Sequence, residues 1–262
     1  MESSRLFTMY HLLSTPTSFD NIRYFKFGIP LVLKRSTRTV STEADALQFL
    51  NNCGLNLPVP RIIDSIVVRG QTFTLMTRIP GELLIDKFEA MTDAQLDIVV
   101  QDVFAVLHSL WTLRQPTQDA GKVMVSASGH GLPGPAQLFD DLEGPYDSVL
   151  DCYVHMSSHL VDSKAELKQL YPAASQALMA DAIVFVHADL RSHNILVKDG
   201  RLSGIIDWEN SGWLPRHWQL HVMRRSCPST RGKLREVIND MRGPDESEAA
   251  YRESKSLLRY HL

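Results

Sequence analysis

Three polar residues suited to phosphoryl transfer lie within the segment His187–Asp207, which reads HADLRSHNILVKDGRLSGIID. Asp189 follows a short apolar run and enters a polar loop, where its carboxylate can orient the proton of an attacking hydroxyl group. Asn194 and Asp207 offer amide and carboxylate oxygens, which Mg²⁺ prefers as protein ligands. These residue types in this order predict a site that uses ATP and Mg²⁺ to transfer a phosphoryl group.

The spacing of these residues agrees with a β-hairpin. Residues 194–198 and 201–206 read as two strands joined by Asp199-Gly200, a pair typical of a two-residue turn. The simplest register pairs Lys198 with Arg201, Leu196 with Ser203, and Asn194 with Ile205. Asp207 then lies one diagonal step from Asn194, roughly 7 Å away. The competing interpretation is a surface loop and hairpin whose carboxylates have no chemical role.

The segment HADLRSHNILV, followed by GIIDWENSGWLPRHW, resembles the aminoglycoside phosphotransferase and choline kinase family, including its fungal members. Weaker similarity covers most of the chain, in the segments VLKR from Val32, PVPRIIDS from Pro58, LMTRIPGELL from Leu75, LHSL from Leu107 and GPYDS from Gly144. The resemblance implies an α+β, bilobal, protein-kinase-like fold with a small antiparallel-sheet N-lobe and a mainly helical C-lobe. It does not identify a substrate.

Lys34 and Glu43 complete the expected site. Taken alone, a lysine that ends a strand and an acid that starts a helix are commonly solvated, and an acid there also suits the helix dipole. Their positions in the family pattern imply that Lys34 reaches the α- and β-phosphates of ATP. Glu43 is then the carboxylate that holds this lysine, with Asp45 as a less favoured alternative.

Five further residues have expected supporting roles. The resemblance implies that Met76 and Arg78 contact the nucleotide. His187 is expected to tie the loop to neighbouring backbone rather than to transfer a proton. Arg191 is expected either to touch a phosphate or the substrate, or to be a solvated loop residue. Glu209 is expected to contact the substrate or to form a local hydrogen bond.

One part of a kinase site is missing from the sequence. Kinases of this fold usually cover the phosphates with a glycine-rich loop, whereas only Gly28 precedes Lys34. Either the segment Ser14–Asn21 replaces this loop or the N-lobe is truncated. The predicted function is an ATP- and Mg²⁺-dependent kinase for a hydroxyl group of a small molecule. The alternative is a kinase-fold protein without phosphoryl transfer, serving as a nucleotide- or ligand-binding module or a repurposed tailoring enzyme.

The predicted organisation follows the order of a kinase. The N-lobe is expected from Met1 to Ile79 and the C-lobe from Pro80 to Leu262, because the pair Pro80-Gly81 interrupts regular secondary structure at this point. Strands are expected at residues 22–27, 31–34, 62–68 and 72–77. Helices are expected at residues 42–50, 92–111, 147–160, 164–180 and 232–241 and within the last dozen residues, with a loop at 122–145.

Composition favours a globular enzyme. The chain has 262 residues, 44% of them hydrophobic, and a net charge of -3. This balance favours neither a nucleic-acid binder nor a membrane-surface protein. No run approaches the roughly 20 apolar residues that span a bilayer. The three cysteines, Cys53, Cys152 and Cys227, are widely separated and odd in number, which argues for a reducing compartment. We therefore expect a cytoplasmic protein.

The sequence narrows the chemical class of the phosphoryl acceptor but does not identify the molecule. No lysine or arginine lies between Lys122 and Lys164, whereas this interval holds Asp140, Asp141, Glu143, Asp147, Asp151 and Asp162. Such a stretch could attract a substrate that bears amines, but a solvated loop with acids at helix starts explains it equally well. A protein acceptor is less favoured, because too few residues separate Asp207 from Trp213 to form a protein-kinase activation segment.

Overall fold

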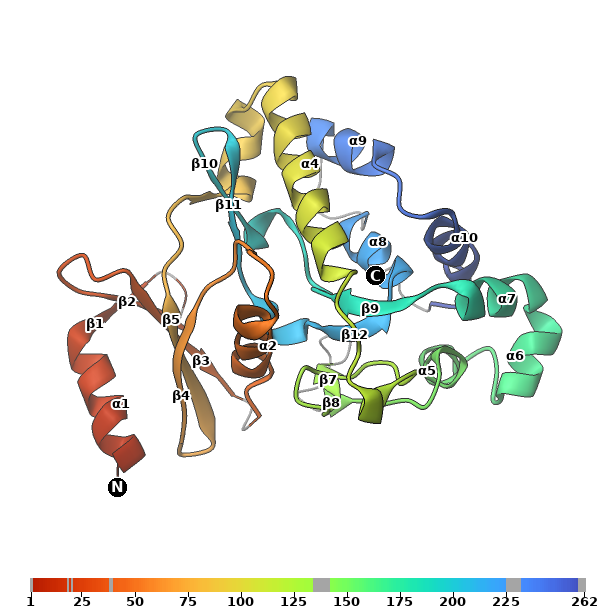
Figure 1. The fold of residues 1–262 in the computed structure, drawn as a ribbon, viewed down its shortest axis with the longest axis horizontal. Helices are drawn as coiled ribbons and strands as arrows, with labels where there is room; N and C mark the ends of the chain where they lie inside the picture. The colour runs from red at the N-terminus through yellow and green to blue at the C-terminus, as the bar shows by residue number, and fades with distance from the viewer. Residues whose placement is uncertain are drawn as a thin grey trace.

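The computed structural model describes residues 2–17, 19, 21–37, 40–133, 142–224 and 232–258. Its N-terminal part is an antiparallel sheet of five strands in the order β1-β2-β3-β5-β4 (Figure 1). The strands are β1 (Ser14–Pro16), β2 (Ile22–Phe25), β3 (Leu31–Ser36), β4 (Ile62–Val68) and β5 (Gln71–Thr77). Helix α1 (Glu2–Leu13) precedes the sheet, and α2 (Thr42–Asn52) connects β3 to β4. The predicted small antiparallel sheet is therefore confirmed.

The two helices lie on opposite sides of this sheet (Figure 1). Tyr10 of α1 packs in one buried cluster with Leu33 of β3. Leu47 of α2 and Met76 of β5 belong instead to the main core of the protein. Because side chains alternate along a strand, Leu33 faces α1 and its neighbour Lys34 faces the side of α2. This alternation directs the lysine toward the helical part of the molecule.

Ser41 caps the start of α2. Its hydroxyl accepts a hydrogen bond from the backbone N–H of Ala44. The Thr42 hydroxyl instead donates to the backbone carbonyl of Glu209 at 2.6 Å. Thr42 is available for this contact because the neighbouring serine already satisfies the helix end. The first turn of α2 is therefore attached to the segment that follows Asp207.

The rest of the described chain is mainly helical, as predicted. Its α-helices are α3 (Leu84–Lys87), α4 (Asp93–Leu110), α5 (Val149–Met156), α6 (Lys164–Leu170), α7 (Pro172–Ala180), α8 (His217–Met223), α9 (Gly232–Asp240) and α10 (Asp245–Ser254). Its 3₁₀ helices are η1 (Phe88–Ala90), η2 (Thr117–Asp119), η3 (Ser192–Asn194) and η4 (Trp208–Asn210). Among these described helices, none is long and apolar enough to cross a membrane.

Three helices depart from their predicted bounds. Helix α5 is shorter at both ends than the helix predicted at residues 147–160. The single helix predicted at residues 164–180 is divided into α6 and α7, because Pro172 lacks an N–H group and starts a new helix. The residue before it, Tyr171, has φ -129° and ψ 60°, which is outside the helical region. Helix α10 lies earlier than the predicted C-terminal helix, and acids in its first turn favour this start. Residues 259–262 of that predicted helix lie outside the described residues.

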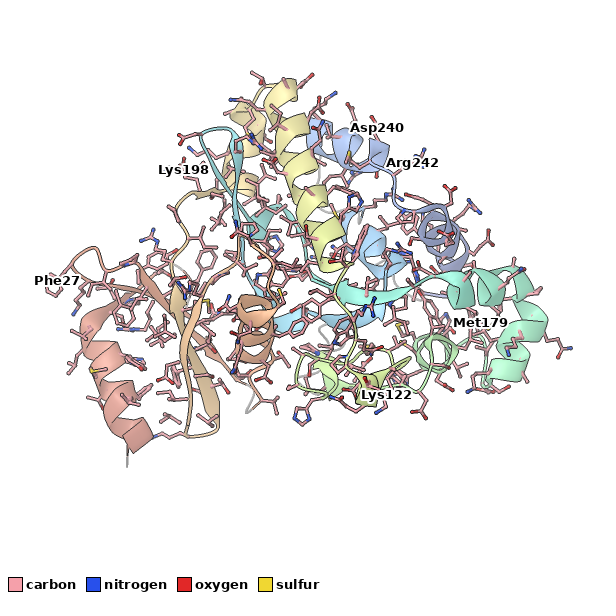
Figure 2. The ribbon with its side chains drawn as sticks, viewed as in Figure 1. Phe27, Lys122, Met179, Lys198, Asp240 and Arg242 are labelled. Atoms are coloured by element: carbon pink, nitrogen blue, oxygen red, sulfur yellow. The ribbon has the colours of Figure 1, made fainter. Side chains whose placement is uncertain are left out.

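The predicted hairpin is present as β10 (Ile195–Lys198) and β11 (Arg201–Ile205). Asp199 and Gly200 both have positive φ, 52° and 75°, as a tight hairpin turn requires. Lys198 faces Arg201 as predicted, and its side chain points away from the molecule (Figure 2). Strand β10 also pairs with β6 (Glu82–Leu83). A second pair, β9 (Ile183–Val186) with β12 (Gly212–Pro215), lies beside α4.

Beyond the turn, the predicted register was wrong by one residue. A bulge between Leu196 and Val197 pairs Leu196 with Gly204 instead of Ser203. A Cβ atom at position 204 would lie 2.6 Å from Cδ1 of Ile79, so Ile79 would have to shift to admit a side chain in place of Gly204. In consequence Asn194 no longer faces Ile205; its carbonyl accepts a hydrogen bond from the N–H of Ile206 at 3.0 Å, one residue nearer to Asp207.

The loop predicted at residues 122–145 contains a short strand pair, β7 (Leu132–Pro133) with β8 (Leu142–Glu143). Asp140 and Asp141, two members of the acidic stretch, lie outside the described residues. Of the cysteines, Cys53 and Cys152 are free thiols, and Cys227 also lies outside the described residues.

A buried polar cluster joins the C-terminal helices to β9. Asp181 accepts hydrogen bonds from the backbone N–H of His217 at 2.7 Å and from the Ser247 hydroxyl at 2.6 Å. The ring Nδ1 of His217 lies 2.8 Å from the same carboxylate, and its Nε2 lies 2.6 Å from the Tyr153 hydroxyl. Burial alone would raise the pKa of Asp181, but the hydrogen bonds and charge of His217 outweigh it and lower that pKa.

Asp181→Ala should lower the free energy of unfolding by about 3 kcal/mol, because it leaves buried donors without their acceptor. Urea denaturation near neutral pH measures this loss. Since the folded pKa is depressed, the contribution is present above the unfolded value of about 3.9 and is lost as pH falls through the folded pKa. The control Asp162→Ala, at an exposed position, should change stability by less than about 0.5 kcal/mol. An Asp181→Ala protein as stable as the wild type would contradict this account.

Candidate functional site

Lys34 is nearly buried and meets three carboxylates. Its Nζ lies 2.6 Å from Oδ1 of Asp207, 3.0 Å from Oε2 of Glu43 and 3.4 Å from Oε2 of Glu209. The contact with Asp207 joins residues 173 positions apart in the sequence. Asp45, the alternative partner considered for the lysine, accepts instead a hydrogen bond from the Ser128 hydroxyl at 2.6 Å. The structure thus brings together Lys34, Glu43 and Asp207 from three separate segments.

Glu43 also connects α2 to the segment that follows the hairpin. Its Oε1 accepts a hydrogen bond from the backbone N–H of Trp208 at 3.3 Å, while its Oε2 pairs with Lys34. The preceding residue, Asp207, has φ 67° and ψ 63°, a left-handed conformation that aspartate tolerates better than most residues. This bend buries Trp208 completely and leaves the Asp207 side chain 34% exposed.

The electrostatics of the cluster follow from burial and crowding of charge. Burial alone would lower the pKa of Lys34, but Glu43, Asp207 and Glu209 outweigh it and raise that pKa. Burial raises the pKa of Glu43 to about 7; Lys34 opposes this rise, whereas Asp207 and Glu209 add to it. The lysine therefore stays protonated, and the cluster gains one more negative charge as pH rises through the Glu43 transition.

The same carboxylates suit a divalent cation. Ligand oxygens of Glu43, Asp207 and Glu209 all lie within 4.8 Å of one another. Asp207 and Glu209 are the partly exposed members, at 34% and 29%. Carboxylate oxygens with excess negative charge fit Mg²⁺, which binds through one or two carboxylates and keeps several waters. The sequence predicts a substrate contact or a local hydrogen bond for Glu209, whereas the structure places it in this carboxylate cluster.

Asn194, the other predicted magnesium ligand, is directed toward Asp189. Its Nδ2 donates to the backbone carbonyl of Asp189 at 2.8 Å and to Oδ2 of the same residue at 3.1 Å. With the nitrogen so engaged, the amide oxygen is the atom of this side chain that can accept a cation. Asn194 is 3% exposed, so its orientation is set by the surrounding loop.

Asp189 lies in the loop after β9, with its side chain 12% exposed. The Nε of Arg191 lies 3.2 Å from its Oδ1, and the Nε2 of His193 lies 3.9 Å from its Oδ2. Burial alone would raise the pKa of Asp189, but the nearby His193 and the charge of Arg191 outweigh it and lower that pKa. The carboxylate is therefore ionised at neutral pH.

His187 holds this loop against the end of β11. Its Nδ1 accepts from the backbone N–H of Asp189 at 3.3 Å, so Nε2 carries the ring proton and donates to the carbonyl of Ile206 at 3.0 Å. The ring packs on Trp208 with centroids 4.5 Å apart. Burial lowers the pKa of His187, which keeps the ring neutral.

Met76 and Arg78 lie farther along the sheet from Lys34. The strand register sets Tyr24, Val32 and Met76 side by side on the face that carries Lys34. The Arg78 guanidinium lies 4.0 Å from the centroid of the Tyr24 ring. Tyr24 was not among the predicted site residues, although alternation along β2 places it on the same face as Ile22, which pairs with Lys34.

The sequence pattern of the phosphotransferase enzyme family matches residues 23–253 of this chain. A search of curated proteins finds no significant match.

Solved structures of aminoglycoside phosphotransferases resemble this fold. The structure of APH(4)-Ia is 17% identical, with a TM-score of 0.63, over 98% of this chain and 88% of that one. ADP-bound APH(2'')-Ib is 16% identical, with a TM-score of 0.57, over 97% and 86%. APH(2'')-IIa in complex with gentamicin is 14% identical, with a TM-score of 0.58, over 96% and 85%. At these identities the likeness establishes the fold alone, and it confirms the predicted kinase-like architecture.

Lys34→Met should destabilise the protein by about 3 kcal/mol near pH 8, because Glu43 then becomes a buried carboxylate without its cation. The pKa of Glu43 is already raised by burial. The free-energy cost of burying the charged Glu43 carboxylate therefore falls as pH drops through that pKa. The loss of stability caused by Lys34→Met should consequently be smaller near pH 5.5. Chemical denaturation of the variant at both pH values measures the difference.

Two further variants serve as controls for this prediction. Lys34→Met combined with Glu43→Gln should recover much of the stability at the higher pH, because no buried charge remains uncompensated. Lys168→Met, at an exposed position of α6, should have little effect at either pH. An equal loss at both pH values for Lys34→Met would contradict the buried-charge explanation.

Proposed function

Because this chain belongs to the phosphotransferase enzyme family, we propose that it transfers the γ-phosphoryl group of ATP to a hydroxyl group of a small molecule, with Mg²⁺ as cofactor. One observation carries this proposal: Lys34 contacts both Glu43 and Asp207, which come from α2 and from the segment after β11. Kinase-type phosphoryl transfer needs a lysine for the phosphates, an acid to hold it and a carboxylate for the metal. The two lobes in this proposal are residues 1–79 and 80–262.

In this proposal the residues of the Asp189 loop orient the acceptor hydroxyl group. Asp189 accepts the proton of the acceptor hydroxyl as that oxygen bonds to phosphorus, a role that suits an ionised and nearly buried carboxylate. His187 and Asn194 hold the loop and the carboxylate in place through the hydrogen bonds they make around Asp189. Asp189 is then the residue of the proposed site that contacts the acceptor.

The phosphates and the metal lie on the other side of the site in this proposal. Lys34 binds the α- and β-phosphates, and Glu43 keeps its ammonium in place. Asp207 and Asn194 hold Mg²⁺, with Glu209 as a further carboxylate in reach of the same position. When bound, Mg²⁺ neutralises charge on the phosphates.

The nucleobase is proposed to lie against the face formed by Tyr24, Val32 and Met76. This row is two residues along the strand from Lys34, a separation of about 7 Å that suits the distance between phosphates and base. Arg78, stacked on Tyr24, extends the flat surface beyond the end of β5.

The acceptor is proposed to be a hydroxylated small molecule. The solved structures with this fold include complexes with hygromycin B, gentamicin and streptomycin. In this chain, part of the acidic stretch is already neutralised, because Asp151 pairs with Lys164 at 2.8 Å. This pair weakens the case for a polyamine acceptor, so no aminoglycoside is specified.

A kinase-fold protein without phosphoryl transfer is the second candidate function. The observation that favours it is the connection between β1 and β2, residues 17–21, which contains no glycine. Within this connection the Thr17 hydroxyl accepts a hydrogen bond from the backbone N–H of Phe19. That amide is thereby engaged within the protein, whereas the amides of a glycine-rich loop cover the phosphates.

Binding of ATP should depend on Mg²⁺ and on Asp207. At about 100 times its dissociation constant, ATP with Mg²⁺ should stabilise the wild type by about 2.7 kcal/mol, which raises Tm by roughly 5–10 °C. Asp207→Ala should lose most of this shift with Mg²⁺ present and show little change without it. The control Asp240→Ala alters a carboxylate on α9 (Figure 2) and should keep the full shift. A wild-type protein that ATP and Mg²⁺ do not stabilise would favour the second candidate.

Asp189→Asn should lower kcat by on the order of 10²–10⁴-fold, the usual contribution of general acid–base catalysis. The amide preserves the shape of the side chain but loses the charge and basicity, so the KM for the acceptor should change little. ADP release during a screen of hydroxylated metabolites measures both constants once an acceptor is found. Near-normal turnover by Asp189→Asn would place the chemistry elsewhere.

A further inference from the structure

The turn between β2 and β3 carries an exposed aromatic side chain. Phe27 is 89% exposed and lies at the edge of the molecule (Figure 2). The N–H of Ile29 donates to the carbonyl of Lys26 at 3.2 Å, and Phe27 and Gly28 between them have φ values of 59° and 70°. A turn with two positive φ values favours asparagine or aspartate before the glycine, because a bulky side chain is crowded in this conformation. Phe27 therefore strains the turn and adds almost no packing to the fold, which indicates a role outside the fold.

The end of α1 enlarges the apolar surface around Phe27. Lys26 holds the turn against this helix, because its backbone N–H donates to the carbonyl of Leu13 at 2.9 Å and its Nζ donates to the carbonyl of Leu12 at 2.8 Å. Leu12 is 68% exposed, and Leu13 and Ile29 are also exposed. We call Leu12, Leu13, Phe27 and Ile29 the apolar tip. These hydrogen bonds fix the apolar tip in place, so its side chains are presented together.

The part of the chain that carries the apolar tip is basic. Residues 1–79 contain nine lysines and arginines and five acids, whereas residues 80–262 contain 18 and 25. The net charge of -3 therefore averages two parts of opposite charge. Two exposed cations lie at the turn itself: Lys26 is one of its residues, and the backbone N–H of Arg78 donates to the carbonyl of Pro30 at 2.7 Å. A charge difference of this kind between two parts of a chain is typical of proteins that bind a membrane or a nucleic acid.

We propose that the apolar tip docks on a membrane surface that contains anionic lipids. Phe27 and Leu12 enter the boundary between the headgroups and the acyl chains, while Lys26 and Arg78 meet the phosphates and carboxylates of the lipids. A projecting tip suits a fluid surface that closes around it, whereas a protein partner needs a pocket of matching shape. The whole-chain net charge argued against a membrane-surface protein, but the local charge reverses that expectation. The proposal is independent of the kinase activity, because no residue of the apolar tip belongs to the proposed site.

The first test measures co-sedimentation of the whole chain with vesicles of phosphatidylcholine, with and without phosphatidylserine. The wild type should bind the vesicles that contain phosphatidylserine, and added salt should weaken this binding. Phe27→Asn should lower the partition coefficient by about tenfold or more, because the ring no longer leaves water. Lys26→Gln should lower it by about fivefold on the anionic vesicles alone.

Met179→Asn is the matched control for these variants. It replaces an exposed apolar side chain of α7 at the opposite end of the molecule (Figure 2) and should bind vesicles as the wild type does. A wild type that binds neither kind of vesicle would overturn the proposal. Equal binding of the anionic vesicles by the wild type and Phe27→Asn would also overturn it. Neither result would affect the proposed kinase function.

The second test separates membrane docking from a role of Phe27 in folding, in nucleotide binding or in self-association. The melting temperature of Phe27→Asn should equal or exceed that of the wild type, because asparagine tolerates positive φ. Its increase with ATP and Mg²⁺ should match that of the wild type. A lower melting temperature or a smaller increase would overturn the proposal, because the ring would then serve the fold or the nucleotide site. Light scattering without vesicles should give the same mass for both proteins. A wild-type dimer that Phe27→Asn dissociates would assign the apolar tip to a second copy of the chain and overturn the proposal.

Discussion

The ammonium group of Lys34 is held between carboxylates from separate parts of the chain, and the arrangement of the site depends on this contact. Glu43 comes from α2, and Asp207 follows the β10–β11 hairpin. Three acids this close together would repel one another without a cation between them. The lysine must therefore face the helical part of the protein, and a slip of one residue in β3 would turn it toward α1 instead.

Helix α2 connects the Lys34 ion-pair cluster to the rest of the protein. Its first turn contacts the segment after the hairpin twice, through the Thr42 hydroxyl and through the Glu43 carboxylate. Farther along, Phe49 packs against Phe185 and Trp213 with ring centroids 5.0 and 5.9 Å apart. Polar contacts thus orient the helix, and aromatic packing attaches it to β9 and β12.

Local sequence determined the hairpin and most of the residues that meet at the candidate site. Asp199-Gly200 specifies a tight turn by its backbone preferences alone, so its presence and the pairing at the turn were predictable. The pairing of Lys34 with Glu43 was predictable only with the family pattern, because a strand-ending lysine by itself has no defined partner. The antiparallel N-terminal sheet and the helical remainder followed from periodicity and from the same resemblance.

Tertiary contacts decided the features that local sequence left open. The bulge that moves Asn194 toward Ile206 accompanies the close packing of Gly204 beneath Ile79, a residue 125 positions earlier in the chain. The Thr42 hydroxyl donates a hydrogen bond to the carbonyl of a residue 167 positions away, a contact that no local pattern specifies. Short-range preferences specify which element forms. The exact register, cap and ion-pair partners depend on groups that become neighbours only after the chain has folded, because hydrogen bonds and packing act over a few ångströms in space regardless of separation in sequence.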